Sequence, residues 1–213
     1  MARSNRIAPS QSTLRNAASG TVIATIPRTW LAVCAAIVAA CSFMVFIPAL
    51  GNQFVDWDDP GNFLNNPNYR GLGWENLKWM FSTFHMGHYQ PLTWMTLGLD
   101  SVVGRLAFGN ELDPRPYHFT NVLLHSFNAA LVFLLAVRLL ERAGWPASRG
   151  LVCGAVFAGL FFGAHPLRAE SVAWATERRD LLSAFFVLLT VLAYLRAQQP
   201  VQPHRTRWMA IAL

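Results

Sequence analysis

Three carboxylates stand within four residues just after the first long apolar run of the chain. They are Asp56, Asp58 and Asp59. Two adjacent carboxylates repel each other, which raises the pKa of one relative to the other. A carboxylate with a raised pKa can take a proton from a substrate as a general base. The pair Asp58 and Asp59 is therefore the first candidate for catalytic chemistry.

A second group of charged residues lies more than a hundred positions further on. It includes Arg168, Arg178 and Arg179. Arginine forms strong, charge-assisted hydrogen bonds with phosphate groups. A base on one side and a phosphate clamp on the other is the layout needed to move a sugar from a lipid-linked phosphate onto a hydroxyl.

Each of these features also has a simpler structural interpretation. The three acids could be a solvated loop after a membrane exit, and Arg178 with Arg179 could anchor a membrane span at the interface. His118, Asn121 and His125 recur on one face of an apolar helix, where polar groups usually face the interior of a bundle. These residues could serve helix packing or contact a substrate, and the sequence leaves both interpretations open.

The elements that must position these residues are membrane-spanning helices. Apolar residues make up 54% of the 213-residue chain and charged residues 13%, against roughly 25% charged in a soluble domain. A span needs about 20 mostly apolar residues. We therefore predict an all-α integral membrane protein with about four transmembrane helices plus the start of a fifth, and a large outer loop with amphipathic helices. The expected spans are residues 29–50, 117–140, 150–164 and 181–195, with the fifth beginning at 208.

The outer loops in this prediction are residues 51–116 and 165–180. The first loop should carry an amphipathic helix over 74–84, because Trp74, Leu77, Met80, Phe81 and Phe84 follow a helical period. A second short apolar helix is expected over 92–103.

The distribution of charge supports this topology. With the N-terminus in the cytoplasm, ten arginines and only one acid, Glu141, fall in the inside segments, whereas the other ten acids fall outside. Residues 1–28 read as a disordered, basic cytoplasmic tail, and residues 29–213 as the polytopic membrane domain. The formal charge of +6 is thus explained by membrane topology, and no nucleic-acid partner is expected.

The cysteines and histidines do not indicate a metal site. Cys34, Cys41 and Cys153 lie inside apolar runs with no ligand spacing. His85 and His88 alone make an incomplete site. A divalent metal is not indicated but stays open, and no cofactor is expected with certainty.

Several short motifs occur in an order that resembles a known family. They are Phe54-Val55 with Asp58-Asp59, Asn65-Asn66-Pro67, Gln90-Pro91-Leu92-Thr93, Tyr117-His118 with Asn121 and His125, Ala164-His165-Pro166-Leu167 with Glu170-Ser171-Val172-Ala173, and Arg179-Asp180-Leu181-Leu182. Over residues 51–195 the chain resembles the N-terminal membrane half of the transmembrane and tetratricopeptide-repeat proteins. Those are similar to protein O-mannosyltransferases and belong to the GT-C glycosyltransferase class.

The resemblance implies a polytopic, inverting glycosyltransferase with a GT-C-like N-terminal portion. The donor would be a polyprenyl-phosphate sugar, with mannose as the expected sugar, and the acceptor would be a protein or glycan. The family's adjacent acids match Asp58, the expected base, and Asp59, which would position it. His165, Glu170 and Arg179 match the second-loop motif and would help to hold the phosphate or sugar.

The chain departs from the family pattern in places. Gln90 stands where arginine is frequent, Arg168 where a second histidine is frequent, and Glu177-Arg178 where a smaller pair is frequent, which leaves the donor sugar open. The later spans and the tetratricopeptide repeats are absent. We therefore expect a truncated part of a longer protein that is inactive by itself.

Two other function classes stay open. A non-catalytic membrane anchor or assembly protein could use the aromatic outer loop, with Trp57, Trp74, Trp79 and Trp94, to bind a partner. A transporter is less favoured, because no span is interrupted by Gly or Pro near its midpoint. The arginine-rich, alanine-rich composition favours a bacterial inner membrane, with an endoplasmic reticulum membrane as the alternative.

Overall fold

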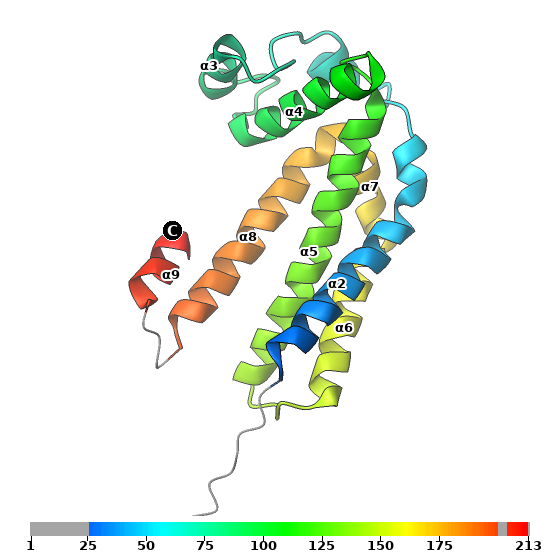
Figure 1. Cartoon of the computed structure of the whole chain (residues 1–213). Helices are drawn as coiled ribbons and strands as arrows, with labels where there is room; N and C mark the ends of the chain where they lie inside the picture. The colour runs from blue at the N-terminus through cyan, green and yellow to red at the C-terminus, as the bar shows by residue number, and fades with distance from the viewer. Residues whose placement is uncertain (1–25, 200–203, 213) are drawn as a thin grey trace, which may run out of the picture.

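The computed structural model describes residues 26–199 and 204–212, and this part of the chain is built from helices without a β-strand. Figure 1 shows a bundle of long helices with a layer of shorter helices across one end. The predicted disordered tail at residues 1–28 lies outside the described residues, except for its last three positions, where helix α2 begins at Arg28.

Four long helices form the bundle: α2 (Arg28–Val45), α5 (Pro114–Arg142), α6 (Arg149–Ala164) and α8 (Arg178–Ala197). Three segments are long and apolar enough to cross a membrane, and α6 with the helical residues Pro166–Ala173, bent by 51°, makes a fourth if it counts as one span. A bilayer offers no hydrogen-bond partners to the backbone, so an apolar run inside it must form a helix. The all-α membrane fold class is confirmed.

The starts of the long helices follow from local chemistry. Asp113 precedes α5, and its carboxylate accepts a hydrogen bond from the backbone N–H of Arg115 at 3.1 Å. Ser148 precedes α6 and accepts from the N–H of Leu151 at 3.3 Å. Both side chains satisfy N–H groups that have no partner in the first turn of a helix.

Four helical segments lie between α2 and α5: η1 (Ile47–Gly51), η2 (Pro60–Leu64), α3 (Trp74–Ser82) and α4 (Pro91–Phe108). We call residues 51–109 the outer layer. In Figure 1, α4 lies across the upper ends of α5 and α8. The sequence predicted α4 to be shorter, but it continues to Phe108 and stops at Gly109, whose φ of 71° suits glycine.

Helix α3 buries only part of the apolar face predicted for it. Met80 is fully buried and Leu77 is half-buried, whereas Trp74 and Phe81 are exposed. The helix also ends before Phe84, since the backbone at Thr83 is extended. The outer layer has a core in which Met80 of α3 and Trp94 of α4 pack in one cluster with Tyr69 and with Tyr117 of α5.

Small residues bring the helices of the bundle close together. A methyl group added at Gly163 of α6 would lie 2.0 Å from the Oγ of Ser42 on α2. Ala129, on α5, contacts the same point and is fully buried. Such small residues are typical of helix contacts within membranes.

The second outer loop (residues 165–180) consists of short pieces: η3 (Pro166–Arg168), α7 (Ala169–Ala173) and η4 (Ala175–Glu177), followed directly by α8. Trp174 has extended backbone angles and separates α7 from η4. At the other end of α8, the short helix α9 (Arg205–Ala212) packs beside it.

Candidate functional site

Asp59 is fully buried and joins the two outer loops. Its Oδ1 accepts hydrogen bonds from the indole N–H of Trp174 at 2.9 Å and the hydroxyl of Thr176 at 2.5 Å. Its Oδ2 accepts from the backbone N–H of Val55 at 2.7 Å. A carboxylate with three donors is held in one orientation. Asp59 therefore fixes residues 55–59 against the second outer loop.

Asp58, the neighbouring residue, is in a different environment. Its side chain is half-buried, and within residues 26–199 and 204–212 no side-chain hydrogen bond or ion pair is made by its carboxylate. The backbone carbonyl of Asp58 accepts from the N–H of Asn62 at 2.9 Å, which starts η2. One carboxylate of the pair is thus committed to the fold and the other is accessible.

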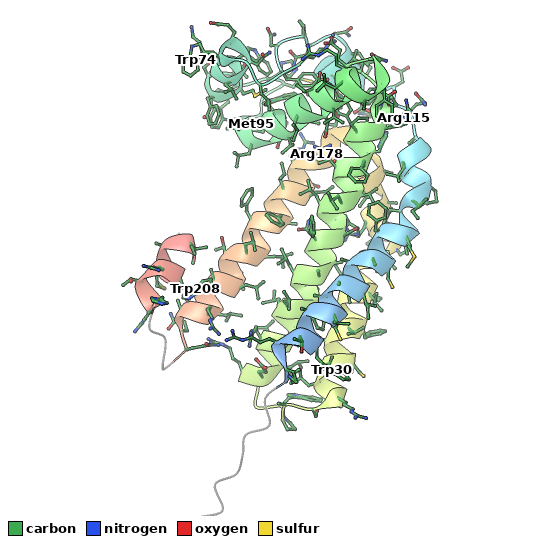
Figure 2. The ribbon with its side chains drawn as sticks, viewed as in Figure 1. Trp30, Trp74, Met95, Arg115, Arg178 and Trp208 are labelled. Carbon is green, nitrogen blue, oxygen red and sulfur yellow. The ribbon has the colours of Figure 1, made fainter. Side chains whose placement is uncertain are left out.

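Arg178 forms a second buried network below α4. Figure 2 places its side chain where α4 meets the upper ends of α5 and α8. Its guanidinium forms an ion pair with Asp100 of α4 at 2.7 Å. The remaining hydrogen bonds go to the hydroxyl of Thr96 (3.2 Å), the carbonyl of Tyr117 (2.8 Å) and the side-chain oxygen of Asn121.

The environment of Asp100 is strongly desolvated. Burial raises the pKa of this carboxyl, and the charge of Arg178 and the hydroxyl of Thr120, which donates at 2.7 Å, act in the opposite direction. Arg178 therefore offsets much of the cost of burying a carboxylate. Burial also raises the pKa of Tyr69, whose hydroxyl lies 2.9 Å from that of Tyr117.

The position of Arg178 corrects one sequence-based expectation. We predicted that Arg178 would bind a phosphate, but its side chain is fully buried and its donors contact acceptors of the protein. A guanidinium enclosed in this way has no free face for a ligand. Its neighbour Arg179 is half-buried instead and pairs with Glu177 at 2.8 Å.

The other predicted phosphate or sugar ligands lie on the second outer loop. His165 is half-buried, and its Nδ1 accepts from the backbone N–H of Leu167 at 3.3 Å, so it caps η3. Arg168 is half-buried, with its guanidinium 4.8 Å from the centre of the Phe162 ring. Glu170 is exposed. The loop thus brings these residues to one end of the bundle, and Asp59 ties them to Asp58.

Sequence reasoning did not single out three residues that organise this region. Thr176 holds Asp59, and Thr96 and Asp100 hold Arg178. A signal existed only for Asp100, since a lone acid within an apolar helix usually has a buried partner. Threonines carry no comparable signal, because their polarity does not reveal a long-range contact.

Comparison with known proteins gives one consistent result. The chain is 29% identical over 167 residues to protein O-mannosyl-transferase tmtc2 of Xenopus laevis, an overlap of 74% of this chain and 18% of that protein. It is 31% identical over 163 residues to Tmtc2 of Drosophila melanogaster, covering 73% of this chain and 16% of that protein. It is 29% identical over 173 residues to human TMTC4, covering 76% and 22% respectively.

The chain is similar to the protein O-mannosyl-transferases. The resemblance inferred from the ordered motifs is thereby confirmed. The chain spans about a fifth of the length of these relatives. No family model and no solved structure matches it significantly. The three relatives named are animal proteins, so they give no support to the expected bacterial inner membrane, although an integral membrane protein is supported.

Proposed function

We propose that the chain forms part of a membrane glycosyltransferase that moves mannose from a polyprenyl-phosphate donor to a hydroxyl of a protein or glycan. The relatives are named protein O-mannosyl-transferases, which supports the mannosyl group and a protein acceptor. The polyprenyl-phosphate donor rests on the family resemblance and on the basic residues of the second outer loop. An endoplasmic reticulum membrane fits this proposal.

The observation that carries the proposal is the division of the carboxylate pair. Asp59 is buried with three hydrogen-bond donors, whereas Asp58 is accessible and has no partner among the described residues. In this proposal Asp58 accepts the proton of the acceptor hydroxyl. The acceptor oxygen then bonds to C1 of the sugar, the bond from C1 to the phosphate oxygen breaks, and polyprenyl phosphate leaves with the bonding electrons.

Residues of the second outer loop complete the proposed site. Arg168 and Arg179 supply positive charge for the leaving phosphate, and His165 and Glu170 lie on the same loop. Arg178 has no direct contact with substrate in this proposal, because it is enclosed by the protein. It positions the loop instead, since it ties the start of α8 to α4 and α5.

The test uses a full-length relative, because this chain spans about a fifth of the length of the relatives it matches. The aspartate aligned with Asp58 is replaced by asparagine, and transfer of mannose from polyprenyl-phosphate mannose is measured in membranes. Loss of a general base should lower the rate by about 10²–10⁴-fold. Unchanged transfer would exclude Asp58 as the base.

A matched pair of variants in the chain itself separates the two roles. Asp58→Asn should leave the thermal midpoint unchanged, because the side chain makes no contact that the fold needs. Asp59→Ala should lower the midpoint, because Trp174, Thr176 and the N–H of Val55 lose their acceptor. Equal effects of the two substitutions would contradict the division of roles.

The alternative of a membrane anchor or assembly protein also has an observation in its favour. Of the four loop tryptophans, Trp57 and Trp74 are exposed, while Trp94 is fully buried and Trp79 is half-buried. Two large exposed aromatic side chains suit a binding surface. If this alternative is correct, substitution of both tryptophans by serine should weaken binding of the partner protein.

A further inference from the structure

An open cavity lies on the side of the bundle, beside the second outer loop. Its volume is about 320 Å³, well beyond the space of a single water molecule. It is bordered by α5, α6, α7, α8 and η3. Its polar lining consists of His125, Asn128, Arg168, Ser171, Ser183 and the exposed carboxylate of Asp180, and Phe162 adds an aromatic ring.

Three polar atoms of these residues are buried without a hydrogen-bond partner: Nδ1 of His125, Oδ1 of Asn128 and Nε of Arg168. His125 and Asn128 are themselves fully buried. Most buried polar groups in folded proteins have a partner, so three exceptions around one cavity call for an explanation. A ligand in the cavity would supply the missing partners.

The contacts already made define what each atom needs. Nε2 of His125 donates to the carbonyl of Gly163 at 3.0 Å, so the neutral ring leaves Nδ1 as an acceptor. The amide nitrogen of Asn128 donates to the carbonyl of Leu181 at 2.9 Å, so its oxygen is also left as an acceptor. Nε of Arg168 is a donor. The cavity thus requires two donors and one acceptor from its ligand.

Hydroxyl groups meet this requirement, because each can donate one hydrogen bond and accept others. The hydroxyls of Ser171 and Ser183 also border the cavity and can bond further hydroxyls. Phe162 gives the site an aromatic wall, since its ring stacks on His125 with centroids 5.5 Å apart and lies beneath Arg168. Ala184 and Val187 on α8 add apolar surface suited to a lipid chain.

We propose that this cavity binds the polyhydroxylated head group of a membrane lipid, with His125 and Asn128 accepting from its hydroxyls and Arg168 donating to one of its oxygens. The proposal rests in part on the proposed function, because Arg168 also belongs to the proposed sugar-transfer site, although the cavity does not include Asp58 or Asp59. Two sources share this chemistry, a polyol phospholipid and a glycosylated lipid.

The test measures lipid retained by the purified chain in detergent micelles, by native mass spectrometry. The probes are phosphatidylinositol and polyprenyl-phosphate mannose, which carry several hydroxyls. Phosphatidic acid and phosphatidylcholine, which lack a polyol head group, are the comparison lipids. We expect at least one probe to bind at least ten-fold more tightly than both comparison lipids, and the probe that binds identifies the source.

Variants connect the binding to the cavity. Asn128→Leu and the milder Ser183→Ala should each weaken binding of the preferred probe, the former by at least ten-fold. Ser126→Ala is the matched control, because Ser126 lies on the same helix but its hydroxyl bonds to the carbonyl of Val122, outside the cavity. Circular dichroism checks that helicity is unchanged, and Ser183→Ala keeps the test valid if Asn128→Leu does not fold.

Four results would overturn the proposal. The first is equal binding of phosphatidylcholine and the polyol lipids, which would mark a general lipid groove. The second is equal binding of phosphatidic acid, which would mark a simple anion site. The third is a Ser126→Ala variant that loses as much affinity as the cavity variants, and the fourth is the absence of saturable binding.

Discussion

The buried ion pair of Arg178 and Asp100 gives the sharpest test of the fold. Replacing Arg178 by methionine keeps an apolar side chain of similar length but leaves Asp100 without its countercharge. Breaking a buried ion pair from one side costs about 3–5 kcal/mol. The free energy of unfolding of the purified chain should therefore fall by about that amount.

Arg179→Met is the matched control, because this neighbouring arginine pairs with Glu177 at 2.8 Å on the partly exposed side of the loop. A pair of that kind contributes about 0–1 kcal/mol. The two substitutions change the same residue type at adjacent positions. The difference between their losses in free energy of unfolding therefore reports the burial and pairing of Arg178 rather than the change of residue type.

The pH dependence of the stability of Arg178→Met tests the same ion pair in a second way. In Arg178→Met, burial holds the pKa of Asp100 above its value in the unfolded chain, with no cation left to lower it. A group with a raised folded pKa contributes stability below its unfolded pKa and loses it as the pH rises. The variant should thus recover part of its stability as the pH falls towards that of a protonated carboxyl.

The double variant Arg178→Met/Asp100→Asn, measured beside its two single variants, completes a double-mutant cycle for the ion pair. Adding Asp100→Asn to Arg178→Met removes the unpaired charge, so the double variant should be more stable than Arg178→Met alone and should lack the extra pH dependence. Unfolding is followed by circular dichroism in detergent with increasing denaturant. Equal losses for Arg178→Met and Arg179→Met, or additive effects in the cycle, would refute the role given to this pair.

The remaining predictions concern helix packing and topology. Gly163→Val should destabilise the bundle by about 1–3 kcal/mol through overpacking, because even a methyl group there would meet Ser42 at 2.0 Å, whereas Gly154→Val in the same helix has open space and should have little effect. The reverse order of stabilities would contradict the packing of α6. For topology, the native cysteines are replaced by alanine and single cysteines are placed at exposed positions, namely Trp57, Trp145 and Leu167. An impermeant thiol reagent applied outside should label the first and third but not the second, and outside labelling at Trp145 alone would invert the topology on which the proposed site depends.

The membrane-helix architecture could be predicted from sequence for a simple reason. Long apolar runs must become helices in a bilayer, whatever their neighbours, because no other structure within them satisfies the backbone. The apolar core of α2 and most of α5 follow from this constraint alone. The predicted helix limits in the outer layer were less accurate, as at the end of α4 and at Thr83. Helix ends there depend on contacts with other parts of the protein, which the sequence does not reveal.

The candidate site could be predicted only as a set of residues. The pair Asp58 and Asp59 is visible as adjacent acids, but the sequence does not say which of them is buried. That depends on the contacts of Asp59 with Trp174 and Thr176, which lie more than a hundred positions away. The side chains of adjacent residues on a turn point in different directions, so the fold decides which of the two carboxylates is buried and which is accessible.

Sequence by itself determined that this chain is an all-helical membrane protein with most of its acids in two outer loops and most of its arginines in the inside segments, because composition and charge act on each segment separately. Only the tertiary structure decided what those charges contact. Arg178 and Arg179 have the same chemistry and adjacent positions, yet the first is enclosed at the start of α8 by α4 and α5 and the second is partly exposed. A rotation of one residue along a helix, about 100°, is enough to turn a side chain from the core to the surface.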